Sequence, residues 1–230
     1  MKSIRAIFMK QALDCYRNKM VLIQYTIFPL IAAIFTELVA KPQENIPDMM
    51  FVMVFAPIFA GMSMITIVAG VIAEDREKNS LRFLRMAGVK PQEYLLGVTA
   101  IMLVAAVSGA IVFGLIGGFR GLEFFAFVLI MVLSAIASMF LGAAIGIFFN
   151  NQQAASAVAM PVAMVLGFGP MITMFNDTAR KVLSCFYTQQ LSESINNLHG
   201  DLGWPLMIIA GNIVVFFVVF YLSYQKKGLN

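Results

Sequence analysis

Residues 124–149 read FFAFVLIMVLSAIASMFLGAAIGIFF, a run that contains no Asp, Glu, Lys, Arg or His. Five further runs are equally free of these residues: 20–36, 50–73, 95–119, 154–175 and 203–224. A helix needs about 20 apolar residues to cross the roughly 30 Å hydrocarbon core of a bilayer. Continuous apolar runs also exclude the alternating pattern of a membrane β-barrel. The sequence therefore predicts an all-α membrane protein with six transmembrane helices.

The composition agrees with a chain that lies mostly in a membrane. Hydrophobic residues make up 60% of the 230 residues and charged residues 12%, whereas a soluble domain has about 25% charged residues. The six runs leave no room for a separate soluble domain. We therefore expect residues 1–230 to form one transmembrane domain.

The basic residues are divided unevenly between the two sides of the predicted bundle. Residues 1–19, the segment 74–94 and the C-terminal tail share one side and hold twelve of the sixteen Lys and Arg residues. The positive-inside rule therefore predicts that both termini are cytoplasmic. Cys15 and Cys185 would then lie on opposite sides, so they could not pair within one chain, and no metal cluster is expected.

The segment before the first run, residues 1–19, allows two interpretations. Its apolar residues share one face of a helix: Ile4, Ile7, Phe8, Ala12 and Cys15. Lys10, Asp14 and Arg17 lie away from that face, as in a helix that lies on the membrane surface. A plain basic flank that only orients the first span fits the same residues.

The most polar segment, residues 74–92, contains the signals of a short helix. Asn79 or Ser80 can cap its N-terminus, and Glu77 and Asp75 would place negative charge near that end. Gly88 suits the left-handed conformation just beyond a helix C-terminus. Pro91 prevents the helix from continuing.

An apolar strip runs along this predicted helix. It comprises Leu81, Leu84 and Ala87, with Phe83 pointing elsewhere and the charged Arg82 and Arg85 on either side. The strip could fit a groove on a cytoplasmic partner, as an amphipathic helix does. It could equally pack beneath the bundle of its own chain.

The second long connection, residues 176–203, has helical spacing of its apolar residues and is expected on the extracytoplasmic side. Asn176 or Asp177 can cap a first amphipathic helix, and a turn follows near residue 200. His199 is the single histidine of the chain. In such a turn we expect it to be solvated rather than catalytic.

The spans lack the acidic or basic residues that mark ion pathways and proton relays. Glu37 and Glu123 are the nearest candidates, and both lie at span ends. This pattern argues against ion-coupled secondary transport. It argues less strongly against a channel lined by backbone and hydroxyl groups.

Two kinds of residue within the spans point to packing and bending. Small residues recur at every fourth position as Ser134, Ser138, Gly142 and Gly146, and as Ala155, Ala159, Ala163 and Gly167. Such rows let helices approach closely, either within one chain or at a dimer interface. Four prolines are candidate hinges, although static kinks are an alternative: Pro29, Pro57, Pro161 and Pro170.

The polar segment after the second span resembles the corresponding loop of ABC-2-type transporter permeases. Those proteins have an acidic–basic run, a Gly-Thr-Leu, a short helix and a Pro-x-x-x-x-x-Gly sequence before the third span. Here the run is 74-EDREK-78, Leu81 follows, and Pro91 and Gly97 match the last motif. Asn79-Ser80 stands where the family has Gly-Thr. The layout of the whole chain is also similar.

The resemblance implies a half-transporter of a bacterial inner membrane. A second copy or a sister permease would complete it, and each permease would contact an ATP-hydrolysing subunit through a coupling helix at residues 81–87. The implied contact residues are Glu74, Glu77, Leu81, Leu84, Arg85 and Gly88. The chain has no G-x-x-x-x-G-K-[ST] phosphate loop. We therefore expect it not to be an enzyme and to hold no cofactor, with ATP and Mg bound by the partner, and we expect no nucleic-acid partner.

The expected activity is ATP-driven export by alternating access. The 17 methionines and 21 phenylalanines fit an amphipathic or apolar cargo such as a drug, a peptide antibiotic or a lipid-like molecule, although lipid-facing surfaces share this composition. A passive channel or pore-forming bundle is the alternative. An intramembrane enzyme is disfavoured because the sequence has no G-x-S-x-G and no paired carboxylates within the spans.

Overall fold

A computed structural model describes residues 2–43, 46–47, 49–86 and 88–227. Helices account for nearly all of this part of the chain, which contains no strand. Before the third span the elements are α1 (Lys2–Arg17), α2 (Lys19–Phe35), η1 (Thr36–Ala40), α3 (Met50–Ile58), η2 (Phe59–Ser63), α4 (Met64–Glu77) and α5 (Ser80–Met86). From the third span onward they are α6 (Pro91–Ile116), α7 (Gly121–Phe148), α8 (Gln152–Thr173), α9 (Asp177–Leu183), α10 (Tyr187–Asn196) and α11 (Gly203–Lys227).

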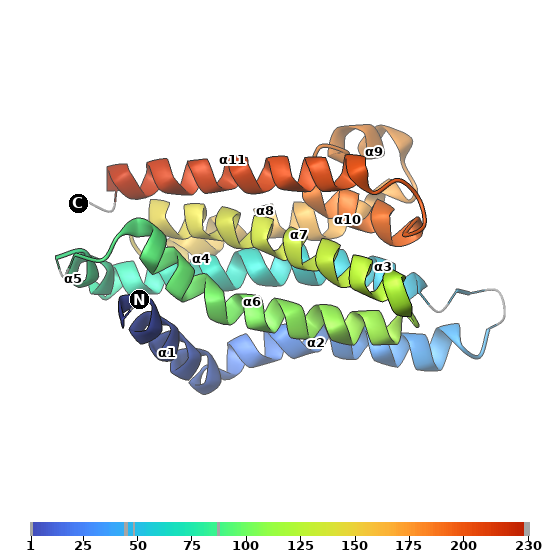
Figure 1. The fold of residues 1–230 in the computed structure, drawn as a ribbon, viewed down its shortest axis with the longest axis horizontal. Coiled ribbons are helices and arrows are strands. Elements are labelled where there is room, and N and C mark those ends of the chain that lie inside the picture. Colours follow the sequence, from blue (N-terminus) through green and yellow to red (C-terminus); the bar gives the residue numbers. More distant parts are fainter. Residues whose placement is uncertain (1, 44–45, 48, 87, 228–230) are drawn as a thin grey trace.

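Six helices of the described residues are long and apolar enough to cross a membrane, which confirms the predicted fold class. They are Val21–Ala40, Met50–Glu77, Glu93–Ile116, Gly121–Phe148, Gln152–Thr173 and Gly203–Lys226. Both ends of the chain and α5 lie at one end of the bundle, and α9 and α10 lie at the other (Figure 1). We refer to these as the α5 end and the α9–α10 end. The structure supports a multi-pass membrane protein with this common placement of the termini.

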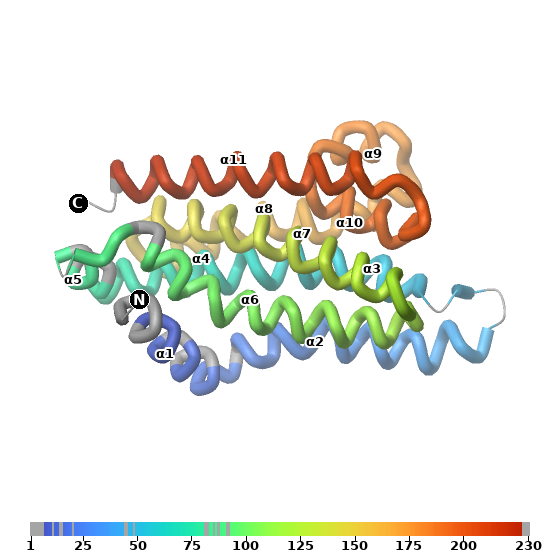
Figure 2. The backbone as a smooth tube through the Cα atoms, viewed as in Figure 1, coloured from blue at the N-terminus to red at the C-terminus, as the bar shows by residue number. Residues whose placement is uncertain are grey.

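The second span occupies the centre of the bundle. It is built from α3, η2 and α4, packs against α7 and α8, and is the most buried of the six spans. The first and last spans, in α2 and α11, are the least buried and run along opposite sides of the bundle (Figure 2). The exposed apolar side chains of these outer helices are what lipid contact requires.

The small residues of α7 allow it to approach the backbone of α4. A Cβ at Gly142 would lie 2.5 Å from the carbonyl oxygen of Ile65, and one at Gly146 would lie 2.7 Å from that of Ala69. Ser138, in the same row, is fully buried. This row therefore packs within the chain.

The small residues of α8 also face the second span. Ala159 and Ala163 are fully buried. A Cβ on Gly61 of η2 would lie 3.2 Å from the Cα atom of Gly167, so glycine meets glycine where the two helices cross. Because both small-residue rows are covered inside one copy, any dimer contact must use other faces.

The prolines lie inside the span helices. Pro29 is in α2, Pro57 is in α3, and Pro161 and Pro170 are in α8. The wide π-helical turn η2 begins two residues after Pro57. A proline lacks the N–H that continues a helical ladder, and a π-helical turn is a usual place for that ladder to adjust.

The N-terminal segment forms a helix, α1, which contacts α6 and α2 and lies oblique to the bundle (Figure 1). Ile7 is buried in the core, and Phe8 and Ala12 are half-buried. Leu13 is exposed. The side chains of Ile4 and Cys15 lie outside the described part of the chain.

Candidate functional site

The end of α4 differs from the predicted loop. The helix of the second span continues to Glu77, so the first four residues of the segment 74–92 are helical. Glu74 pairs with Lys78 one turn later. Asp75 and Glu77 were expected to place negative charge near the N-terminus of the following helix, and the structure shows that both carboxylates also bind other elements.

Asp75 is buried, with 4% of its surface exposed, and links three helices at the α5 end. One of its carboxylate oxygens forms an ion pair with the Lys10 ammonium of α1. The other accepts a hydrogen bond from the Tyr94 hydroxyl of α6 at 3.0 Å. A buried carboxylate is stable only when it is paired and hydrogen-bonded. The Lys10–Asp75–Tyr94 network therefore fixes the end of α4 against α1 and α6.

The next two charged residues of α4 bind the last turn of α7 and the first turn of α8. The Arg76 guanidinium donates a hydrogen bond to the carbonyl oxygen of Ile147, near the end of α7. The Glu77 carboxylate accepts a hydrogen bond from the N–H of Gln152 at 3.0 Å, in the first turn of α8. A carboxylate is favoured at this position by the helix dipole. Consecutive residues of one turn thus contact α1, α6, α7 and α8.

Asn79 forms the junction between α4 and α5. It has a left-handed φ of 57°, its N–H donates to the carbonyl oxygen of Arg76, and its carbonyl oxygen accepts from Phe83. Asn adopts left-handed backbone more readily than other residues with a side chain. This explains how a residue with a side chain can occupy this left-handed junction.

Gly88 closes α5 as predicted. Its φ is 80°, and the N–H of Val89 donates to the carbonyl oxygen of Leu84 at 3.1 Å. This bond belongs to the left-handed cap that glycine favours at a helix C-terminus. Asn79 and Gly88 therefore set the length of α5.

The described side chains of α5 fit one of the two interpretations of the apolar strip, namely that it packs beneath the bundle of its own chain. Leu84 is half-buried and packs against the core of its own chain. Phe83 and Met86 are 65% and 67% exposed. The side chains of Leu81 and Arg85 lie outside the described part of the chain. Among the side chains of α5 that the structure describes, Phe83 and Met86 are the exposed apolar ones, whereas Leu84 covers the end of the bundle.

Uncharged polar groups form most of the hydrogen bonds at the α9–α10 end. Asn176 caps α9 by accepting from the N–H groups of Thr178 and Ala179, at 2.9 and 3.1 Å. In α10, Ser194 donates to the carbonyl oxygen of Gln190 at 2.7 Å, and Gln190 donates to that of Ser184 at 2.6 Å. Most of these bonds join residues close in sequence.

Three hydrogen bonds join α10 and the turn before it to the spans. Thr173 donates to Gln189 at 2.9 Å, Ser138 donates to Tyr187 at 2.6 Å, and the Asn212 amide donates to the carbonyl oxygen of Cys185 at 2.9 Å. Burial raises the pKa of the Tyr187 phenol, and the hydrogen bond from Ser138 opposes this shift only in part. The phenol is therefore neutral at physiological pH.

The charged candidates at the span ends occupy exposed positions. Glu37 pairs with Lys41 on the surface. His199 is largely exposed and lies 2.6 Å from Glu123. Among the described residues no group of three or more His, Cys, Asp or Glu side chains could hold a metal ion. These positions do not form a reaction centre.

Sequence reasoning did not identify Asp75, Lys10 and Tyr94 as partners. A charged residue in the last turn of an apolar helix was a signal, but its partners lie 65 and 19 residues away. The placement of α1 decides this network. No local pattern encodes that placement.

Comparison with known proteins identifies the family. The model of a family described as ABC-2 family transporter protein matches residues 2–222. No curated protein matches the chain. The match covers all six candidate spans except the last residues of α11, together with α5, α9 and α10. The chain therefore belongs to the ABC-2 family of membrane transporter proteins.

Proposed function

We propose that this chain is the permease half of an ATP-driven exporter. ATP and Mg are bound by a separate ATPase subunit, and a second copy or a sister permease completes the transport unit. The observation that carries the proposal is the last turn of α4, whose side chains bind α1, α6, α7 and α8 next to α5. A displacement of α5 would therefore move α1, α6, α7 and α8 together.

The ATPase contact is assigned to α5. Phe83 and Met86 give this short helix an exposed apolar surface beside a charged segment. An apolar helix face seated in a protein groove is a common recognition mode. Glu74, Leu81, Arg85 and Gly88 are assigned to the same contact by their places in the sequence. Leu84 packs against the core beneath α5, and Glu77, the last residue of α4, binds the first turn of α8.

The cargo is proposed to pass along the open face of α8. A groove of about 560 Å³ on this face has Gln152, Gln153 and Ser156 at one end and Met160 and Met164 farther along. Polar groups at one end and adaptable methionines beyond them suit an amphipathic molecule. A second permease placed over this face would enclose the groove, and Pro161 lies within its wall as a candidate hinge.

Alternating access follows from this arrangement. Closure of the ATPase subunits on ATP would move α5 and, through the end of α4, the spans that it binds. Pro29, Pro57 and Pro170, with the π-helical turn after Pro57, are the positions at which those spans would bend. Release would take place at the α9–α10 end, in the direction of export.

The test is purification of the tagged chain from its native cells in mild detergent, with mass spectrometry of the proteins that accompany it. We expect an ATPase with a phosphate loop to accompany the wild type. The double variant Phe83→Glu and Met86→Glu should lose it, since two carboxylates cannot enter an apolar groove without a large desolvation cost.

The matched control is Phe175→Glu, which changes a phenylalanine that is 85% exposed next to the far end of α8. This variant should retain the ATPase. Retention of the ATPase by the double variant would contradict the role of α5. Absence of an ATPase from the folded wild type would favour passive flux, to be measured in liposomes.

A further inference from the structure

An apolar groove of about 360 Å³ lies between α6 and α11, with α7 as its floor. In Figure 1, α7 runs between these two helices. Leu95, Leu96, Thr99 and Leu103 of α6 form one wall, and Phe217 of α11 forms the other. Leu95 and Thr99 are buried, whereas Leu96 is 57% exposed. Because every lining residue belongs to a candidate span, the groove opens toward lipid.

The groove lies within the half of the membrane nearest the α5 end. The third span begins at Glu93, and Leu103, the farthest wall residue of α6, lies ten residues later. Ten helical residues rise about 15 Å, roughly half of the hydrocarbon thickness. Phe217 lies nine residues before the end of the last span at Lys226, which is a similar depth. The acyl chain of a lipid whose headgroup lies at the α5 end therefore reaches the whole groove.

Two lysines lie at this end of the groove. Lys90 directly precedes α6, Lys226 lies in the last turn of α11, and both are exposed. The rings of Tyr94 and Tyr224, with centroids 6.4 Å apart, bring these two helix ends together. The carboxylate in the first turn of α6, on Glu93, accepts from the N–H of Lys90 at 3.2 Å. Basic residues between the ends of neighbouring spans are a common site for phospholipid headgroups.

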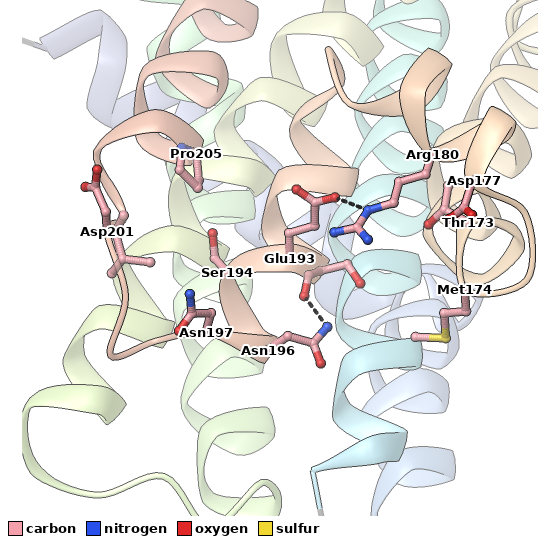
Figure 3. Close-up of a pocket in the computed structure, with 12 residues that line it drawn as sticks. Thr173, Met174, Asp177, Arg180, Glu193, Ser194, Asn196, Asn197, Asp201 and Pro205 are labelled. Atoms are coloured by element: carbon pink, nitrogen blue, oxygen red, sulfur yellow. Dashed lines mark hydrogen bonds and ion pairs between the residues drawn. The ribbon is translucent and has the colours of Figure 1, made fainter.

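The opposite end of the bundle has the opposite charge pattern. A cavity of about 510 Å³ at the α9–α10 end (Figure 3) has Asp177, Glu193 and Asp201 in its wall, with one guanidinium, on Arg180. Arg180 pairs with Glu193 at 2.9 Å. An anionic group is repelled by such a wall. The charges of the two ends therefore favour an anionic ligand at the α5 end.

From these features we propose that the groove between α6 and α11 binds an acyl chain of an anionic phospholipid. Its phosphate would lie between Lys90 and Lys226, because ammonium groups form charge-assisted hydrogen bonds with phosphate oxygens. Leu96, Leu103 and Phe217 would contact the chain. The proposal uses only the groove and the charges beside it, so it does not depend on the proposed transport function.

The test uses tryptophan fluorescence at the groove. Trp204, the single tryptophan of the chain, is replaced by phenylalanine, and Leu96→Trp places a reporter at the exposed edge of the groove. The full chain is placed in phosphatidylcholine nanodiscs with a small fraction of phosphatidylglycerol, and one lipid at a time carries bromine on its chains as a quencher. We expect phosphatidylglycerol to associate about tenfold more strongly than phosphatidylcholine, because two lysines attract its charge.

Two variants test the two parts of the site. Lys90→Gln combined with Lys226→Gln and Lys227→Gln should abolish the preference for phosphatidylglycerol; Lys227 is included because it follows Lys226 in the sequence. Leu103→Phe adds volume to the half-buried groove wall and should reduce quenching by phosphatidylglycerol at Leu96→Trp. Thermal unfolding verifies that each variant is folded.

The matched control reporter is Ile23→Trp on α2, on the opposite side of the bundle (Figure 2). Ile23 is 56% exposed and lies two residues into the first span, a depth close to that of Leu96 in the third. The lysine variant should leave quenching of this reporter unchanged. An equal change at both reporters would show a general effect of charge and would overturn the site.

The remaining outcomes each decide the proposal. Equal quenching of Leu96→Trp by the two brominated lipids, or a preference that survives the lysine variant, would overturn the headgroup assignment. Unchanged quenching in Leu103→Phe would show that the chain does not enter the groove. Absence of quenching by either lipid would show that protein, and not lipid, covers the groove, which would also overturn the proposal.

Discussion

The two ends of this bundle are held together in different ways. At the α5 end, consecutive charged residues of a single helical turn each bind a different element: Asp75 binds α1 and α6, Arg76 binds α7, and Glu77 binds α8. At the α9–α10 end, amides and hydroxyls bind mainly within their own short helices. One end joins distant segments, and the other forms a local unit.

This difference suggests a division of tasks. A charged turn that contacts four helices can transmit a displacement to all of them, and its buried member, Asp75, is costly to separate from its partners. The α9–α10 unit makes few hydrogen bonds to the spans and is held to them mainly by Tyr187, Leu191 and Ile195, which are buried in the core. A unit with few polar ties can shift as a whole. The α5 end is therefore suited to receive a movement, and the α9–α10 end to yield.

The largest effect is expected from a change that loosens both ends. Gly142→Val would press a side chain into the backbone of α4 at Ile65, at a cost of about 3 kcal/mol of unfolding free energy. Gly211→Val, in α11, is the control, because nothing lies within 4 Å of a Cβ at that position. Thermal unfolding in detergent measures both variants. Equal stability of the two would contradict the close α4–α7 contact.

A second change breaks the α5 end alone. Asp75→Ala leaves the Tyr94 hydroxyl buried without its acceptor and should cost about 2 kcal/mol. Glu74→Ala, one residue earlier, removes only a partly exposed pair with Lys78 and should cost less than about 0.5 kcal/mol. Thermal unfolding of both variants measures the difference. If Glu74→Ala proved as costly as Asp75→Ala, the Lys10–Asp75–Tyr94 network would not be the main tie.

A third change tests the independence of the α9–α10 end. Asn212→Leu removes the donor to the carbonyl oxygen of Cys185, worth about 1 kcal/mol. Hydrogen exchange should rise over residues 177–196 and stay unchanged over residues 74–89. Faster exchange in both segments would show that the two ends are more tightly coupled than the bonding pattern indicates.

The smallest effect is expected at the junction of α4 and α5. Asn79→Gly places a residue without a Cβ at a left-handed φ, so stability should change by no more than about 0.5 kcal/mol. Gly118→Asn, at another left-handed position in the loop between α6 and α7, is the reciprocal change. A large loss in Asn79→Gly would mean that the Asn79 side chain, and not its backbone conformation, holds the junction.

The sequence was sufficient for features that depend on local patterns. Six charge-free runs predicted six spans, and Gly88 marked the end of α5. Asn176 was one of two predicted caps for α9, and the structure selects it. Each of these signals lies within a few residues of the structure that it specifies.

Features that depend on packing between distant segments could not be read in the same way. Helical spacing placed Leu84 on an apolar strip, but it could not decide that Leu84 packs against the bundle while Phe83 stays exposed. The Lys10–Asp75 pair joins residues 65 positions apart. The partners of Asp75 and Glu77 could not be found from neighbouring residues, because they lie on α1, α6 and α8.

The most direct test of the central claim is hydrogen exchange of the chain purified together with its ATPase, with and without a non-hydrolysable ATP analogue. If the end of α4 passes movement from α5 to the spans, nucleotide should change exchange in residues 74–89 and in the neighbouring ends of α1, α6, α7 and α8. Exchange that changes elsewhere while these segments stay constant would contradict the account.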